Sequence, residues 1–318
     1  MIFHNSKSAE KQTCFITCIL FSVIISLFSS GCSFFPSIKK ATKKLTFNLA
    51  DEGLKKKIGI TCFEDSVLQD TLSFKKIFSE DIIKSISDEC SEIITVKISA
   101  PNGFNHLVDS LSPVSGQVNN LALADRGRRL GLSAIMIGSL VDIKVDKERS
   151  GILWFKDTYD YEQLQVLVEV YDTETGAKLI DENYFYKTDI SNLKSDFVYG
   201  KKKISISATN HAIRQIAAMA GEDICDSLYR LPWKGYIIST EGQKFIISSG
   251  KRAGLAPGEI LDVYDTGSII KGVEGRQFLV PGSKAGEIKL TTVYADNSEA
   301  VLVSGKVAGI GSTVKRKN

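Results

Sequence analysis

The stretch VLVEVYDTETGAKL, Val166 to Leu179, decides the fold of the first part of the chain. Runs rich in β-branched and aromatic residues stand on both sides of the short sequence TETG. Two such runs joined by a short turn that contains glycine are typical of a β-hairpin. The sequence therefore predicts two antiparallel strands, Tyr159–Asp172 and Ala177–Thr188, with this turn between them.

The residues around the hairpin alternate between strand and helix patterns. Compact apolar runs predict strands at residues 57–63, 93–99 and 133–145. Apolar side chains at three- and four-residue spacing predict helices at residues 73–90, about 118–130 and 206–228. Gly131 is expected to end the second helix, and Pro232 stops the third because proline does not continue a helix. We therefore expect an α/β domain with a mixed sheet over residues 55–231.

The composition changes after Lys234. Thirteen of the chain's 25 glycines lie between Gly235 and Gly311, and they separate short alternating runs such as KFIIS, EILDVYD and EAVLV. Short strands with frequent turns indicate a small barrel, and closure of the barrel protects the strand edges. We expect this β-barrel to cover residues 232–318.

The first 31 residues have the composition of a secretory signal peptide. Two lysines precede the uncharged apolar run of residues 13–28, and the small residues Ser29, Ser30 and Gly31 lead to Cys32. An uncleaved N-terminal anchor is the alternative, although the run is short for a transmembrane helix, which needs ~20 apolar residues. Residues 32–54 are then expected to form a tether from the anchor to the first domain. The lysines at 39–44 and, where the tether meets the domain, at 55–57 are expected to be solvated or to contact an anionic lipid surface.

The sequence Ser-Gly-Cys resembles the lipobox of bacterial lipoproteins, although Ser29 stands where an aliphatic residue is usual. This resemblance implies that Cys32 carries lipid and becomes the mature N-terminus. Ser33 in place of aspartate is similar to lipoproteins that are sent to the outer membrane, so the resemblance implies a lipid-anchored location at its periplasmic face.

Three cysteines remain after Cys32: Cys62, Cys90 and Cys225. Their number is odd, no CxxC pair occurs and no histidine is near, so neither a metal site nor a disulfide framework is predicted. Each cysteine lies in an apolar pattern and is expected to be a small buried side chain. Oxidation of one pair in an extracytoplasmic compartment is the alternative.

The sequence offers no motif of an enzyme. It has no GxSxG, no phosphate-binding GxxxxGK[ST] and no HExxH, and DTETG lacks the further ligands of a calcium loop. The 40 basic and 37 acidic residues give no general nucleic-acid-binding charge. We therefore expect no catalytic residues, metal, cofactor, nucleic acid or small-molecule substrate.

Two segments resemble known envelope proteins. Residues 124–145 and 166–179, with Leu-Gly, Gly-Ser and the Asp-Thr-Glu-Thr-Gly turn, are similar to the core domain of CsgG-like and LpoB-like outer-membrane lipoproteins. Residues 235–305 resemble the C-terminal domain of the flagellar assembly protein FlgT, whose N-terminal domain has no counterpart here. The resemblance implies an anticodon-binding-domain-like α/β fold, as in CsgG, followed by a small SH3-like β-barrel.

The resemblance also implies a function: a non-enzymatic periplasmic lipoprotein that assembles an envelope structure, flagellar-ring-like or secretion-related, through protein partners or self-association. A CsgG-type oligomeric secretion component is the first alternative. This alternative is disfavoured, because a strand that crosses a membrane needs one apolar face. The segments 146–157 and 187–203 carry charges at both odd and even positions, so neither offers a continuous lipid-facing surface. An LpoB-like activator of an envelope enzyme is the second alternative. It is disfavoured because the tether of about twenty residues reaches at most ~70 Å, which is short for reaching deep through the cell wall.

A long glycine-containing loop, Gly267 to Ser283, carries the candidate contact residues. Exposed apolar residues on a loop above a rigid barrel are typical of a docking surface. The alternative is that they close the barrel as one more strand. The candidates are Ile269, Ile270, Phe278, Leu279 and Val280.

Overall fold

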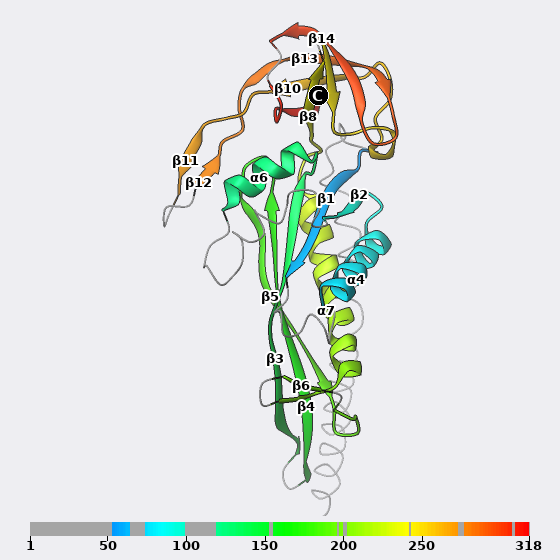
Figure 1. Cartoon of the computed structure of the whole chain (residues 1–318), viewed down its shortest axis with the longest axis vertical. Coiled ribbons are helices and arrows are strands. Elements are labelled where there is room, and N and C mark those ends of the chain that lie inside the picture. The colour runs from blue at the N-terminus through cyan, green and yellow to red at the C-terminus, as the bar shows by residue number, and fades with distance from the viewer. Residues whose placement is uncertain are drawn as a thin grey trace, which may run out of the picture. The chain divides into compact units, whose positions relative to one another are not determined.

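The computed structural model describes residues 53–63, 74–98, 119–152, 155–195, 197–199, 202–241, 243–272, 277–306 and 309–317. Its first part is a mixed five-stranded sheet in the order β2-β1-β3-β4-β5, with β1, β2 and β3 parallel and β3, β4 and β5 antiparallel (Figure 1). The strands are β1 (Lys56–Phe63), β2 (Ile93–Lys97), β3 (Ala134–Ile152), β4 (Phe155–Asp172) and β5 (Lys178–Asp189). The α/β prediction is confirmed, and so is the hairpin across TETG.

Three helices pack on this sheet within the described ranges: α4 (Phe74–Glu89), α6 (Asn120–Arg129) and α7 (Ile206–Tyr229). The chain passes from β1 through α4 to β2, then returns through α6 to β3 on the other side of β1. Crossover connections between parallel strands are right-handed. The step from β1 to β2 and the step from β2 to β3 run in opposite directions along the sheet, so their two helices lie on opposite faces. The predicted end of α6 is also confirmed, since Gly131 follows it with a φ of 71°.

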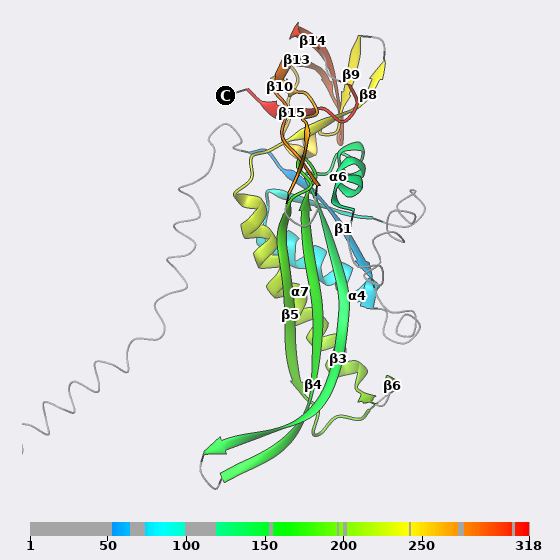
Figure 2. The same cartoon turned by 90° about the vertical axis from the view of Figure 1, so that its left-hand side faces the viewer.

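Successive residues of β3 contribute side chains to two different apolar cores. Met136 packs with residues of α4 and α7 in the larger core, whereas Ile135 and Ile137 pack with Leu123 of α6 in a smaller one. Alternation along a strand points successive side chains to opposite faces, so one strand supplies both cores. Figure 1, which views the sheet nearly edge-on, shows α6 on one side of the strands and α4 and α7 on the other, and Figure 2 shows the strands β3, β4 and β5 side by side.

The buried carboxylate of Glu162 on β4 accepts hydrogen bonds from donors at the start of α7. Ser205 precedes this helix and makes no capping bond with its own side chain. Instead its backbone N–H donates to Glu162 Oε2 at 3.0 Å, and the Thr209 hydroxyl donates to Oε1. A carboxylate at a helix N-terminus accepts from unpaired N–H groups and is favoured by the helix dipole. This contact fixes the start of α7 against the middle of the sheet.

Strands β3 and β4 are longer than the sequence pattern indicates, because their register continues from Ala134↔Asp172 to Ile152↔Phe155. The outer half is a charged ribbon in which Lys147 pairs with Asp160 at 3.5 Å, and Glu148 pairs with Lys187 of β5 at 2.8 Å. Such cross-strand pairs of opposite charge support a strand without an apolar face. A short hairpin of β6 (Phe197–Tyr199) and β7 (Lys202–Ile204) follows β5.

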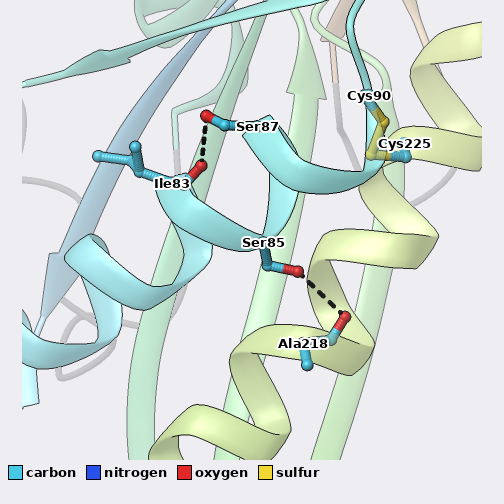
Figure 3. The surroundings of a disulfide bond; sticks show 6 residues. All are labelled: Ile83, Ser85, Ser87, Cys90, Ala218 and Cys225. Carbon is cyan, nitrogen blue, oxygen red and sulfur yellow. Dashed lines mark hydrogen bonds between the residues drawn. A yellow bond between two sulfur atoms is a disulfide. The ribbon is translucent and has the colours of Figure 1, made fainter.

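A disulfide joins Cys90, just after α4, to Cys225 of α7 (Figure 3). The helices lie close there, because Gly221 has no side chain: a Cβ atom at this position would lie 2.2 Å from the Ser85 hydroxyl. Ser85 also donates to the backbone oxygen of Ala218 at 3.4 Å. All three cysteines are buried, as predicted, but Cys90 and Cys225 are joined in this disulfide and only Cys62 is a free thiol among the described residues. The alternative, oxidation of one pair, is therefore correct.

We predict that loss of this disulfide lowers the free energy of unfolding by about 2–5 kcal/mol, because the bond closes a loop with a sequence separation of 135 residues. Urea unfolding of the Cys90→Ala, Cys225→Ala double variant, measured beside the oxidised protein, gives the difference. Cys62→Ala is the matched control for reductant effects. Equal midpoints for the double variant and the oxidised protein would contradict the prediction.

The second part is a closed barrel with the strand order β10-β13-β14-β9-β8-β15. Its strands are β8 (Gly235–Glu241), β9 (Lys244–Ile247), β10 (Ile260–Tyr264), β13 (Lys284–Val293), β14 (Ser298–Gly305) and β15 (Thr313–Arg316), with a short 3₁₀ helix at Lys251–Ala253. Trp233, Leu261 and Ile288 belong to its buried core. The predicted closed barrel is confirmed.

The signal segment, Cys32 and the lysines at 39–44 lie outside the described residues. The prediction that Lys55–Lys57 belong to a solvated tether is wrong in part, because β1 begins at Lys56 and both Leu54 and Lys56 are buried. Leu54 packs in the barrel core. In the described part of the chain, no helix combines the length and apolar character needed to cross a bilayer.

Candidate docking surface beside the barrel

The loop between β10 and β13 carries a hairpin of its own. Strands β11 (Ile269–Lys271) and β12 (Gln277–Leu279) form a separate two-stranded sheet, with Ile269 opposite Leu279 and Ile270 opposite Phe278. The barrel closes through six other strands. The alternative that the candidate residues add one more strand to the barrel is therefore wrong.

Strand β12 is held against the first part of the fold. The Leu279 N–H donates to the Thr175 carbonyl at 2.8 Å, and the Asn120 side-chain amide donates to the Gln277 carbonyl at 2.6 Å. Thr175 belongs to the turn between β4 and β5, and Asn120 is the first residue of α6. Figure 1 shows the hairpin beside α6. These contacts hold β12 in place and leave β11 as the outer strand.

Two glycines form the neck of the hairpin. A Cβ atom on Gly267 would lie 1.4 Å from the Val280 carbonyl oxygen, and one on Gly282 would lie 2.1 Å from the Asp265 carbonyl oxygen. The strands therefore approach each other as closely as only glycine allows. Backbone bonds from Val280 to Ser268 (2.9 Å) and from Asp265 to Ser283 (3.1 Å) continue the pairing down to the barrel.

The five candidate residues divide into two groups. Ile269, Ile270 and Val280 are exposed, with 57%, 49% and 39% of their surfaces accessible, whereas Phe278 and Leu279 are half-buried. Isolated exposed apolar residues are normal, but here three lie on one small hairpin. Ile269 and Ile270 are successive residues of β11 and point to opposite faces, so the hairpin exposes apolar side chains on both faces. We call Ile269, Ile270 and Val280 the hairpin surface. The structure brings the five predicted residues together, while Cys32 lies outside the described residues.

A buried ion-pair network fixes the turn under the hairpin to the barrel. Lys234, with 4% of its side chain exposed, contacts the carboxylates of Asp172 and Glu174, the latter at 3.5 Å. Lys315 of β15 approaches Glu174 at 2.9 Å. Buried charges are costly unless they are paired. The two carboxylates of the turn and the two lysines of the barrel region meet this requirement together.

Between these charges, Thr173 is fully buried and contacts both parts of the fold. Its hydroxyl lies 2.8 Å from the Tyr236 hydroxyl of β8 and donates to the Leu132 carbonyl ahead of β3. Arg128 of α6 donates to the Thr173 carbonyl at 2.9 Å. Burial raises the pKa of Tyr236 well above its ordinary value, so this phenol stays protonated and keeps its hydrogen bond.

Lys57 of β1 makes a second bridge to the barrel. Its ammonium group donates to the backbone carbonyls of Ser248 and, at 2.9 Å, Asp296. Burial lowers the pKa of Lys57, although the negative charge of Asp296 opposes this effect. A lysine predicted for the tether thus takes part in the fold. The run of three lysines in the sequence has no periodicity that reveals this role.

We predict that Lys234→Met lowers the free energy of unfolding by about 3–5 kcal/mol, because it leaves two buried carboxylates without this partner. Urea unfolding followed by the fluorescence of the buried Trp233 measures the change. Adding Asp172→Asn to Lys234→Met is expected to recover part of the loss.

The matched control for Lys234→Met is Lys147→Met, which removes an exposed pair with Asp160 and is expected to change stability little. Similar midpoints for the two lysine variants would show that the buried network does not hold the turn to the barrel.

Comparisons with known proteins do not assign this chain to a family. No protein-family model matches the chain, and no curated protein is a significant match. Among solved structures, the hypothetical protein CT253 from Chlamydia trachomatis is similar over 54% of this chain and 99% of its own, with 15% identity and a TM-score of 0.35.

Two further solved structures resemble about half of the chain. A PelC dodecamer from Paraburkholderia phytofirmans matches over 52% of this chain and 87% of its own (10% identity, TM-score 0.28). Lipoprotein GNA1162 from Neisseria meningitidis matches over 55% of this chain and 99% of its own (9% identity, TM-score 0.27). With scores this low, no statement about the present chain rests on these likenesses.

Proposed function

We propose that this protein is a lipid-anchored, non-enzymatic component of a bacterial envelope assembly, held by Cys32 at the periplasmic face of the outer membrane. The support is the signal-like N-terminus with its small residues before Cys32, together with the resemblance of the sequence to CsgG-like cores and to the FlgT C-terminal domain. The disulfide between Cys90 and Cys225 agrees with an oxidising compartment, where such bonds persist.

The single observation that carries the assembly role is the hairpin surface. The pair β11–β12 lies outside the closed barrel and exposes Ile269, Ile270 and Val280, yet its base is held by the glycine neck and by Thr175. An apolar surface on a fixed support loses little conformational entropy when a partner binds. We propose that this hairpin is the contact to a protein partner and that the sheet domain is its stable support.

We predict that Cys32→Ala releases the protein from the membrane fraction and abolishes the mass added by lipid, because a stable anchor needs more than one acyl chain on the lipoprotein cysteine. Fractionation of cells and mass spectrometry of the processed chain measure both effects. Cys62→Ala is the control, since Cys62 is buried in the fold. Retention in the membrane with an unchanged processed mass would contradict the anchor.

We predict that Ile269→Ser with Ile270→Ser removes the protein's crosslinks to its partner in cells and leaves the unfolding midpoint unchanged. Both side chains are exposed, so the fold does not depend on them, whereas a docked partner would bury them. Crosslinking in the producing cells and urea unfolding of the purified variant provide the two measurements.

Two control variants accompany this experiment. Leu302→Ser with Val303→Ser changes an equally exposed apolar pair on β14 and is expected to keep every crosslink. Phe278→Ser with Leu279→Ser changes half-buried residues of β12 and is expected to lower stability. Crosslinks that survive in the isoleucine variant would remove the hairpin surface from the proposal.

A further inference from the structure

The outer edge of β5, which pairs with no further strand among the described residues, is a second surface of the molecule, away from the hairpin. β5 lies at the end of the five-stranded sheet and is twelve residues long, whereas the opposite edge strand, β2, has five residues. An edge strand presents a row of N–H and C=O groups that can pair with another extended chain. A strand of this length offers enough of them for a peptide to bind by adding a strand to the sheet.

A groove follows this edge. It has a volume of about 540 Å³ and is lined by seven consecutive residues of β5, Lys178 to Tyr184, and by Asp223 of α7. Ile180 and Tyr184 of the lining are buried, whereas its acidic residues Asp181 and Glu182 are exposed. At ~3.4 Å per residue, seven residues of β5 are about 24 Å long, the length of a seven-residue extended peptide.

The charges along the groove are acidic. Tyr184 donates a hydrogen bond to Asp223 at 2.7 Å. Burial raises the pKa of Tyr184 most, and the hydrogen bond to Asp223 and the negative charges of Asp223 and Glu182 raise it further, so both carboxylates act on the same hydroxyl. The one lysine of the lining, Lys178, is already paired with Glu169 at 2.6 Å and with Asp181 at 3.0 Å. Glu182 and Asp181 are exposed. The groove therefore favours a cationic occupant.

We infer that the β5 edge binds an extended segment of a partner protein that carries lysine or arginine at alternate positions. The segment's backbone pairs with the edge of β5 along Lys178–Tyr184. Side chains of one parity lie toward Glu182 and Asp223, because residues 180, 182 and 184 share one face of the strand. This surface goes beyond the proposed function, since it involves neither Cys32 nor the hairpin surface.

The test uses the full processed chain and a fluorescent peptide with blocked ends and the sequence Lys-Val-Lys-Val-Lys-Val-Lys. Anisotropy titration is expected to show saturable binding that Glu182→Lys weakens at least tenfold. Hydrogen exchange is expected to show new protection of backbone amides in β5. The exposed side chain of Glu182 makes its reversal compatible with folding, and an unchanged unfolding midpoint verifies this.

Two controls separate strand addition from simple charge attraction. Glu80→Lys makes the same charge change at an exposed position of α4 and is expected to leave binding unchanged. A peptide with proline in place of the central valine keeps all four lysines but disrupts strand pairing, and it is expected to bind at least tenfold more weakly.

Three outcomes would overturn the inference. Equal binding to wild type and Glu182→Lys would show that the groove does not select the peptide. Protection confined to the β11–β12 hairpin would assign the binding to the hairpin surface. Self-association through β5 that grows with protein concentration and is lost in Glu182→Lys would assign this edge to a second copy of the chain.

Discussion

The contact of Lys234 with Asp172 and Glu174 is the constraint on which the arrangement of the two folded parts depends. β8 begins at the next residue, Gly235, so the position of Lys234 sets where the barrel starts. Asp172 is the last residue of β4, and Glu174 lies in the turn that joins β4 to β5. A buried ammonium group cannot move away from its carboxylates without a large desolvation cost, and the turn and the barrel are therefore held together.

The same turn also positions the hairpin beside the barrel. The four residues from Asp172 to Thr175 contact three residues of other segments: Lys234 before β8, Tyr236 within β8, and Leu279 of β12. Asp172 further accepts bonds from the backbone and the hydroxyl of Thr175, which hold the turn in one conformation. A turn that contributes so many contacts leaves the hairpin surface little freedom at its base. The proposed docking function uses this rigidity.

The helix α7 connects the stability of the sheet domain with its second surface. Glu162 holds the start of this helix, the disulfide holds it to the end of α4, and Asp223 between them lines the groove at β5. Both of these contacts restrain α7, the helix that contributes Asp223 to the groove. The two proposed surfaces thus lie on elements that the core supports.

The periodicity of the sequence by itself determined the strands and helices of the sheet domain, the TETG hairpin and the short strands of the barrel. These features follow from residues close in sequence, such as the apolar spacing of α4 and the glycines after Lys234. The apolar residues near Phe278 were recognised as a group for the same reason. The ribbon beyond Val145 was missed, because charged residues that pair across two strands carry no apolar alternation.

Only the tertiary structure decided the features that depend on distant residues. Cys90 and Cys225 meet although 135 positions separate them, and Lys57 reaches Ser248 in the barrel. The separate hairpin was also beyond local patterns: Ile269 and Ile270 have the composition of a barrel strand, but they pair with β12, whose Leu279 bonds to Thr175 outside the barrel. Local sequence sets which residues prefer a strand, but the contacts of the folded chain set which strand they join.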